Sequence, residues 1–393
     1  MTSPQYDLLL KGGDVIDPAQ SLHARRDVAF ANGKVAALAE SIPTDSASEV
    51  VDCTGHLVAP GMIDLHVHVF WGVSHYGIWP DTHCVAKGVT TAVDAGSAGA
   101  DTFPGFRKFI IDASATRLFA HLNISAQGML DPEIGELMDI RFARVDRALA
   151  TIEENRDVIL GVKVRLTKHS LVSEESGIRP LHLAREAADS AGLPIMVHPQ
   201  DAWCDSLDDI LAVMRKGDVL THCFHNMRCG IFDDAGQIRD SVHAAIERGV
   251  IFDVGHGAGS FSWDVVERAL ALGIQPTTIS SDLHVYNVNG PVFDLATTAT
   301  KFLHLGLSLE ETIAKVTTIP AGVIHMKDQI GTLAPGAWGD AVVFRHETGE
   351  FPLVDSLGAI RTGRQRLVPV HTVRAGRLYQ AAVHAHTHHH HNH

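Results

Sequence analysis

Residues 6–58 consist of short segments in which apolar and polar positions alternate, separated by glycine, proline and other turn residues. Alternation with a period of two is typical of strands that bury one face. The sequence therefore predicts a small β-domain at the N-terminus, with strands at residues 7–11, 13–16, 27–30, 33–38 and 49–52.

After Pro60, apolar segments alternate with stretches in which apolar residues recur every three or four positions. The first pattern predicts buried strands and the second predicts amphipathic helices. We predict eight strands, at residues 62–69, 90–95, 119–125, 161–166, 195–198, 219–222, 251–255 and 277–281. Helices are predicted between and after them, for example at 180–191, 207–216, 240–248, 263–272 and 309–316. Alternating strands and helices indicate parallel pairing, and eight strands is the number that closes a parallel barrel.

From Gly331 onward, short strands return at residues 340–345, 368–373 and 377–379, and we expect them to complete the N-terminal β-domain. The predicted fold class is α/β. A (β/α)8 TIM barrel spans residues 60–330, and a small discontinuous β-sandwich domain is formed by both termini, residues 1–59 and 331–380. Residues 381–393 are a histidine-rich tail, either a natural metal-chelating extension or a purification tag.

The composition narrows the classes of function. The chain has 393 residues, of which 45% are hydrophobic, so a large core can form. Its net charge of −14 disfavours nucleic-acid binding, and we expect a small-molecule substrate and a homo-oligomer. No apolar run could span a bilayer and no cleavable leader is visible, so we expect no membrane association and a cytoplasmic location. The five cysteines form no CxxC pair and are expected to be free thiols, most of them buried.

The first barrel strand carries His66 and His68, which share one face because side chains alternate along a strand. Two histidines at this spacing form a weak motif, since a solvated strand face can carry the same pair. On the fourth strand, Lys163 and Arg165 point into the barrel interior. A buried ammonium needs a partner, such as an ordinary salt bridge, or a chemical change. Addition of carbon dioxide to Lys163 would give a carbamate that can bridge two divalent metals.

Three further candidates stand at the ends of other predicted strands, namely His198, His222 and Asp282. The carboxyl ends of barrel strands meet around one pocket, where this architecture places its active sites. Each residue alone has an ordinary structural interpretation. Together, on separate strands, they predict a metal site.

These residues make the chain similar to the amidohydrolase superfamily. The resemblance rests on the segment 59–68 with its two histidines, on Lys163, His198, His222 and Asp282, and on the glycine-containing segment 331–344. It is strongest to the branch of dihydroorotases, D-aminoacylases and related deacetylases. The resemblance implies that His66, His68 and Asp282 bind one metal, that His198 and His222 bind another, and that carbamylated Lys163 bridges both. Two divalent ions are expected, zinc being usual, although manganese or iron would fit.

The function implied by the resemblance is metal-dependent hydrolysis of an amide or ester bond by a metal-bridging hydroxide. Asp282 would take the proton from this hydroxide and pass it to the leaving group. The expected substrate is small and acidic, an N-acyl amino acid or an acylated 2-hydroxy acid. Arg165 is placed to pair with its carboxylate, an internal ion pair being the alternative. His256, His284 and Tyr286 could add hydrogen bonds or serve only loop structure.

Other functions remain open at this point. A cyclic-amide hydrolase resembling dihydroorotase or hydantoinase would use the same ligands. A mononuclear deaminase is disfavoured, because it has no use for Lys163. Outside enzymes, some proteins of this fold are non-catalytic assembly proteins that have lost their ligands, whereas no ligand position is missing here. A metal-storage role is suggested only by the histidine-rich tail.

Overall fold

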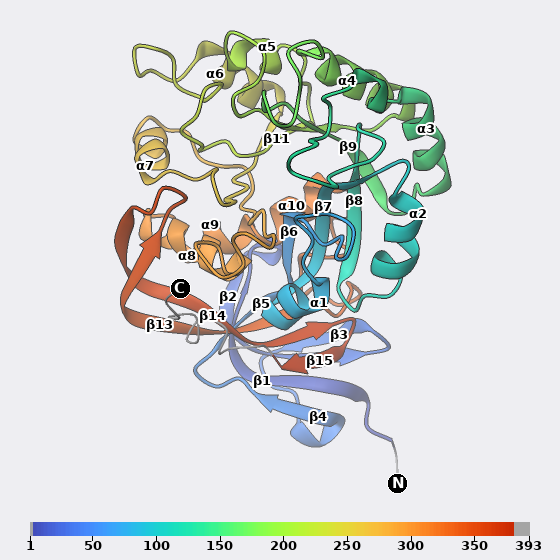
Figure 1. Ribbon diagram of the computed structural model, residues 1–393. Helices are drawn as coiled ribbons and strands as arrows, with labels where there is room; N and C mark the ends of the chain where they lie inside the picture. The colour runs from blue at the N-terminus through green and yellow to red at the C-terminus, as the bar shows by residue number, and fades with distance from the viewer. Residues whose placement is uncertain (1–2, 381–393) are drawn as a thin grey trace.

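Two hydrogen-bonded sheets organise the chain, and the computed structural model describes residues 3–380 of it (Figure 1). The histidine-rich tail predicted at 381–393 lies outside the described residues. One sheet is parallel and is covered by helices, and the other joins the two ends of the chain. None of the helices within residues 3–380 combines the length and the apolar character that a bilayer crossing requires.

The parallel sheet has seven strands in sequence order, and every neighbouring pair is parallel. Its strands are mostly buried, as expected when both faces of a parallel sheet are covered. They are β6 (Met62–Val67), β7 (Val89–Gly99), β8 (Arg117–Asn123), β9 (Ile159–Arg165), β10 (Ile195–His198), β11 (Val219–Leu220) and β12 (Ile251–Phe252). Seven of the eight predicted strands are therefore present at the predicted places.

The eighth predicted strand, residues 277–281, forms no regular ladder. Single parallel bridges join Asp253 with Thr278 and Val67 with Leu283, so this segment contacts the chain beyond both edge strands of the curled sheet. Only part of its backbone bonds to the neighbouring strands: the N–H of Thr277 donates to the carbonyl of Phe252 in β12. The N–H of Ile279 instead donates to the carbonyl of Lys315, and that of Ser281 donates to Asp64.

Ten helices occur within the described residues, and α3 to α7 lie on the outside of the parallel sheet in Figure 1. Helices predicted at 180–191, 240–248, 263–272 and 309–316 are confirmed to within a few residues, whereas the one predicted at 207–216 ends at Leu211. The helices are α1 (Pro80–His83), α2 (Phe103–Phe106), α3 (Val145–Glu154), α4 (Arg179–Ala191), α5 (Leu207–Leu211), α6 (Asp240–Arg248), α7 (Trp263–Ala271), α8 (Leu295–His304), α9 (Leu309–Ala314) and α10 (Thr318–Val323). Shorter helical turns are η1 (Pro18–Gln20), η2 (Thr44–Ser46), η3 (Val85–Lys87), η4 (Arg107–Ile111) and η5 (Ile140–Phe142).

The second sheet is built from both ends of the chain, because β13 pairs antiparallel with β5. Both termini thus meet in one hydrogen-bonded sheet of eight strands, while the two-layer sandwich stays a prediction. Its strands are β1 (Tyr6–Asp17), β2 (Leu22–Ala31), β3 (Lys34–Ala39), β4 (Ala47–Asp52), β5 (Leu57–Pro60), β13 (Ala341–Val354), β14 (Ile360–Arg374) and β15 (Arg377–Gln380). The predicted strands 7–11 and 13–16 form the single strand β1, with an irregular register between Leu10 and Gly13.

The hairpin of β13 and β14 extends beyond the terminal sheet and lies beside α8 in Figure 1. At its tip, the N–H of Ser356 donates to the carbonyl of Phe261, and the N–H of Trp263 donates to Asp355. The hydroxyl of Ser356 also donates to the carbonyl of Gly257, at 3.1 Å. The terminal sheet therefore reaches the loop at 255–262, which follows β12.

Lys301 of α8 also binds the loop at 255–262 through a hydrogen bond to His256. Its buried Nζ donates to three acceptors, His256 Nε2 at 2.7 Å, the carbonyl of Pro291 at 3.1 Å and that of Val354 at 2.6 Å. Nδ1 of His256 donates to the carbonyl of Gly257, which leaves Nε2 free to accept. Three acceptors match the three N–H bonds of an ammonium group. One buried lysine side chain therefore ties the hairpin to the loop around His256.

We expect Lys301→Met to lower the free energy of unfolding by about 3 kcal/mol or more, because three buried acceptors lose their donor at about 1–3 kcal/mol each. Thermal unfolding measures the change. Lys327→Met is the matched control, since Lys327 is exposed and should tolerate the substitution. Equal melting temperatures for Lys301→Met and the unchanged protein would show that the three hydrogen bonds of Lys301 do not stabilise the fold.

The deficit of Lys301→Met should also depend on pH. Burial lowers the pKa of Lys301 to about 7 from its ordinary value of 10.5. Between these two values the unfolded chain binds more protons than the folded chain, so Lys301 contributes more stability as the pH rises. The difference in stability between the two proteins should therefore be larger at pH 9 than at pH 6.5, and a pH-independent difference would contradict this.

Candidate metal centre

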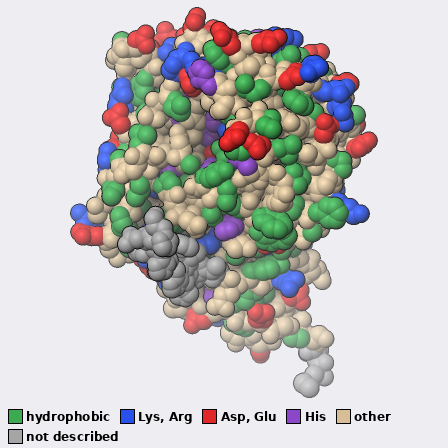
Figure 2. Space-filling view, viewed as in Figure 1, with side chains coloured by type: hydrophobic (Ala, Val, Ile, Leu, Met, Phe, Trp, Pro, Cys, Tyr) green, Lys and Arg blue, Asp and Glu red, His purple; other side chains and the backbone are tan. Residues whose placement is uncertain are grey.

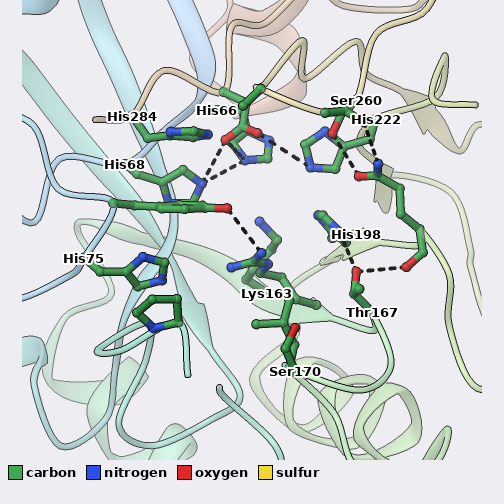
Figure 3. A pocket seen from close by; sticks show the side chains of 18 of the residues that line it. His66, His68, His75, Lys163, Thr167, Ser170, His198, His222, Ser260 and His284 are labelled. Atoms are coloured by element: carbon green, nitrogen blue, oxygen red, sulfur yellow. Dashed lines mark hydrogen bonds and ion pairs between the residues drawn. The ribbon is translucent and has the colours of Figure 1, made fainter. Parts of the chain in front are cut away.

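All six predicted metal ligands line one pocket of about 320 Å³ at the carboxyl ends of the parallel strands. Figure 3 shows the five labelled ligands pointing toward a common centre, and in the space-filling view histidine side chains are seen within a hollow of the visible face (Figure 2). The structure thus brings together His66, His68, Lys163, His198, His222 and Asp282.

The closest approaches in the pocket surround the carboxylate of Asp282. Its Oδ1 lies 3.0 Å from Nε2 of His66 and 3.0 Å from Nε2 of His68, and the two Nε2 atoms are 3.2 Å apart. Nε2 of His222 lies 3.9 Å from Oδ2 of Asp282. The ring centroids of His198 and His222 are 4.5 Å apart, so His198 lies next to the cluster around Asp282.

Hydrogen bonds behind two of the histidines determine which nitrogen carries the proton. Nδ1 of His222 contacts the carbonyl of Gly255 at 2.6 Å, and a carbonyl can only accept. Nδ1 of His66 contacts the hydroxyl of Thr221 at 2.9 Å, and that hydroxyl donates its single proton to Asp253. Nδ1 is therefore the donor in both rings, and each Nε2 presents a lone pair to the pocket.

The same argument fixes the other two rings. Nδ1 of His68 contacts the hydroxyl of Ser97 at 2.9 Å, and this hydroxyl is hydrogen-bonded to Asp94. His198 is turned the other way, because its Nε2 contacts Thr167, whose hydroxyl donates to the carbonyl of Gln200. Nε2 of His68 and Nδ1 of His198 are thus the acceptor atoms, and four imidazole lone pairs face the pocket.

Such a group of acceptors fits a divalent cation. Oδ1 of Asp282 is buried and has no hydrogen-bond partner within residues 3–380, although two imidazole lone pairs lie 3.0 Å away. Burial also lowers the pKa of the histidines, to about 3 for His68 and His222 and well below the ordinary value for His66 and His198. Neutral imidazoles and a carboxylate are the ligands that zinc and related ions take.

Lys163 lies in the same pocket and is 1% exposed. Its Nζ donates to the carbonyl of Ala95 at 2.8 Å, the single hydrogen bond that it makes within the described chain. Burial lowers the pKa of Lys163 to about 8. The side chain passes over Gly96, where an added Cβ would lie 2.5 Å from the Lys163 Cγ.

Two ligands sit on strained backbone, since His222 has a φ of 61° and Asp282 a φ of 54°. Left-handed conformations of this kind cost residues other than glycine roughly 1 kcal/mol or more and are found at functional sites. For Asp282 the surroundings hold the turn, because its N–H donates to the carbonyl of His66 and its own carbonyl accepts from Asn287.

The predicted substrate contacts are placed differently from one another. Arg165 lines the pocket, as a substrate contact would. It also forms an ion pair with Glu136 at 3.0 Å, which was the alternative interpretation of this residue. His284 lines the pocket and stacks on Tyr76, with ring centroids 4.1 Å apart. Tyr286 is 57% exposed beside them. The structure does not bring His256 into the lining, because its ring stacks on Phe261 and bonds to Lys301.

Several lining residues were not singled out in the sequence. They include His75 and Tyr76 after β6, Gln200 after β10, and Met227 in the loop that follows β11. Glu136, the partner of Arg165, comes from a long loop after β8. Their position a few residues after the strands could have indicated that they lie near the pocket. No pattern of residues distinguishes them from the other residues of the same loops.

We expect Gly96→Ala to reduce the amount of metal bound per chain, because the new Cβ would displace Lys163. Elemental analysis of the purified, metal-treated protein measures this. Gly273→Ala is the matched control: Gly273 has a φ of 84°, close to the 85° of Gly96, and nothing lies within 4 Å of its added Cβ. Both variants bear the backbone cost of about 1 kcal/mol, and only Gly96→Ala should lose metal. Equal metal contents in the two variants would show that metal binding does not depend on the position of Lys163.

Known proteins are similar to this chain over most of its length. The model of the family described as "Amidohydrolase family" matches residues 57–379. A protein named deacetylase from Enterococcus faecalis is 38% identical over 379 residues, covering 95% of this chain and 99% of the relative. A deacetylase of Agrobacterium fabrum is 34% identical over 343 residues, covering 87% of this chain and 83% of the relative.

Two solved structures are also similar over nearly the whole chain. One, titled as an adenine deaminase, has a TM-score of 0.88 and 37% identity, covering 95% of this chain and 100% of that one. Another, titled as a dihydroorotase, has a TM-score of 0.84 and 32% identity, covering 95% of this chain and 97% of that one.

Proposed function

Since the chain belongs to the amidohydrolase family, we propose that this metal-dependent hydrolase removes an acyl group, bound as an amide or an ester, from a small acidic molecule. An N-acyl amino acid or an acylated 2-hydroxy acid is the substrate class. The observation that carries the proposal is the set of four imidazole lone pairs facing a buried carboxylate oxygen without a hydrogen-bond partner. The deacetylase names of full-length relatives favour acetyl as the acyl group.

We assign His66, His68 and Asp282 to one cation and His198 and His222 to a second, with Lys163 between them as a carbamate. The lowered pKa of Lys163 supports this, because a neutral amine can attack carbon dioxide, forming a nitrogen–carbon bond and releasing a proton. When bound, two zinc or similar ions would activate a water molecule and polarise the acyl carbonyl.

Asp282 is the general base and acid in this proposal. Its Oδ1 faces the two histidines of β6, whereas Oδ2 lies farther from its neighbour His222, at 3.9 Å. Oδ2 would accept the proton of the attacking water and later return it to the leaving nitrogen or oxygen. Gly257 leaves room for this oxygen, because an added Cβ at this position would lie 2.5 Å from it.

The pocket offers different surroundings to the two ends of such a substrate. Nη2 of Arg165 lies 3.5 Å from the hydroxyl of Tyr76, and its guanidinium lies over the Tyr76 ring at 5.2 Å. A substrate carboxylate would pair with the part of the guanidinium that lines the pocket. Pro132, Leu171 and Met227 supply apolar lining for the remainder of the molecule.

The family also supports the finer fold assignment, which we retain as a proposal. Residues 60–330 would form the (β/α)8 barrel with 277–283 as its eighth strand, and residues 1–59 and 331–380 the β-sandwich domain. The two bridges of the segment at Thr278 and Leu283 favour closure of the barrel.

Product formation from a panel of candidate substrates tests the proposed function. The panel contains N-acetyl-D- and L-amino acids, O-acetylated 2-hydroxy acids, cyclic amides including dihydroorotate, and adenine. We expect acetate release from an acidic member, together with about two metal ions per chain. Faster cyclic-amide hydrolysis or adenine deamination would overturn the substrate class, and one metal ion per chain would overturn the two-metal assignment.

Asp282→Asn should lower kcat by a factor on the order of 100 to 10,000, the usual range for a positioned acid or base. Asparagine keeps one oxygen at this position, so metal content and melting temperature should change little. Asp328→Asn is the control, because Asp328 is exposed and has a φ of 67°, in the same left-handed region. A kcat close to that of the unchanged protein would exclude Asp282 as the proton carrier.

Arg165→Met should raise KM for an acidic substrate roughly 10-fold or more, because a charge-assisted pair contributes about 1.5–3 kcal/mol. The methyl ester of the same substrate serves as the internal control. Glu136→Gln is introduced in the same protein, because a Glu136 carboxylate without its partner would repel the acid more than the neutral ester. The expected result is therefore a loss of preference for the acid over the ester, and an unchanged preference would refute the carboxylate contact.

A further inference from the structure

Two cysteines outside the metal centre lie in contact with each other. The Sγ atoms of Cys204 and Cys229 are 3.7 Å apart. Cys204 lies in the loop after β10, which ends at His198. Cys229 lies in the loop after β11, and His222 is two residues beyond the end of that strand. A disulfide has a sulfur–sulfur bond of about 2.05 Å, so a small approach of the two loops would suffice for a bond.

Other contacts already hold the two loops together. The N–H of Asp201 donates to the carbonyl of Arg228 at 3.0 Å, and Nη2 of Arg228 donates to the carbonyl of Cys204 at 2.8 Å. Nη1 of Arg228 also bonds to Asp201 and to the carbonyl of Ala202. These hydrogen bonds keep the two loops, and with them the two cysteines, next to each other.

The pair is accessible to a small oxidant. Cys229 lines a cavity of about 460 Å³. This cavity shares Met227 with the lining of the metal pocket and is otherwise lined by different residues. Cys204 is partly exposed. Three arginines and three aspartates line the same cavity, and Arg228 is the arginine next to Cys229 in the chain. The hydrogen bond from Cys204 lowers the pKa of the Cys229 thiol, and the N–H of Ala202 adds to this.

The remaining cysteines offer a contrast within the same chain. Cys53, Cys84 and Cys223 are buried, and burial raises the pKa of their thiols, to about 12 for Cys53 and well above the ordinary value for the other two. Thiolates are the nucleophilic form, so these three should react slowly with oxidants.

We propose that Cys204 and Cys229 form a reversible disulfide when the protein meets a peroxide. The Cys229 thiolate attacks one peroxide oxygen, the oxygen–oxygen bond breaks, and Cys229 becomes a sulfenic acid while the other oxygen leaves as water after protonation. The Cys204 sulfur then attacks the Cys229 sulfur, and the hydroxyl leaves as a second water. Two thiols lose two hydrogens, and one peroxide is reduced to two waters.

The bond would fasten two loops that border the metal pocket. Gln200 and Met227 line that pocket, and Nε2 of Gln200 lies 3.5 Å from Sδ of Met227. A disulfide between 204 and 229 would enclose β11 and α5 in a covalent loop. Since a cross-link restricts the unfolded chain, the oxidised protein should melt about 4 °C higher. The proposal does not depend on the substrate or on the reaction catalysed.

Peroxide treatment of the full-length, metal-loaded protein tests the inference, with thiols counted after denaturation. The five thiols of the chain should fall to three, and a reductant should restore them. Trypsin locates the bond, because cleavage after Arg228 separates Cys223 from Cys229. A peptide containing Cys204 should then be joined to the peptide that begins at Cys229.

Cysteine variants provide the controls. Cys204→Ser and Cys229→Ser should each lose the reversible oxidation and the rise in melting temperature. Cys53→Ser, in the terminal sheet, should keep both. The proposal is overturned if the unchanged protein keeps five thiols under peroxide, if Cys229 gains oxygen atoms without bonding to Cys204, or if the bond joins two chains.

Discussion

The structure depends on one electrostatic requirement, the need for positive charge among acceptor atoms that converge in a buried pocket. Lone pairs of His66 and His68 point at the same carboxylate oxygen of Asp282, at 3.0 Å. No protein donor within residues 3–380 satisfies that oxygen. Such an arrangement is unfavourable by itself and becomes favourable with a cation, so the fold is arranged around a ligand that the chain does not supply.

Buried carboxylates behind the pocket maintain this arrangement where the sheet ladders end. Asp253 accepts from the hydroxyls of Thr221, Thr278 and Ser280, and so joins the end of β11 to the segment after β12. Asp64 accepts from the hydroxyl of Ser281 and from the N–H of His66. Burial raises the pKa of Asp253 to about 6 and that of Asp64 to about 7, which shows that holding these groups ionised is costly. The hydrogen bonds that they accept offset part of this cost and fix the tautomers of the ligands.

The parts of the site that could be predicted from the sequence are those that a strand places. Alternation along β6 and β9 orients His66, His68 and Lys163, and the ends of β10 and β11 locate His198 and His222. The eighth segment shows where this reasoning stops, because backbone bonds to Phe252 and His66 are interrupted there by bonds to Lys315 and Asp64, and no regular ladder forms. Tyr76 and Glu136 come from loops, where contacts distant in sequence determine the conformation and no periodic pattern exists.

The glycine-rich loop after β12 illustrates how the terminal sheet affects the metal centre. Gly259 of this loop lines the pocket. Gly255 and Gly257 instead make room for ligands, since added Cβ atoms would lie 2.7 Å from Nδ1 of His222 and 2.5 Å from Oδ2 of Asp282. The same loop is bonded to Ser356 of the β13–β14 hairpin and, through His256, to Lys301. The hairpin is therefore connected to the backbone that packs against His222 and Asp282, so the chain ends that lie far from the pocket in sequence help to define its geometry.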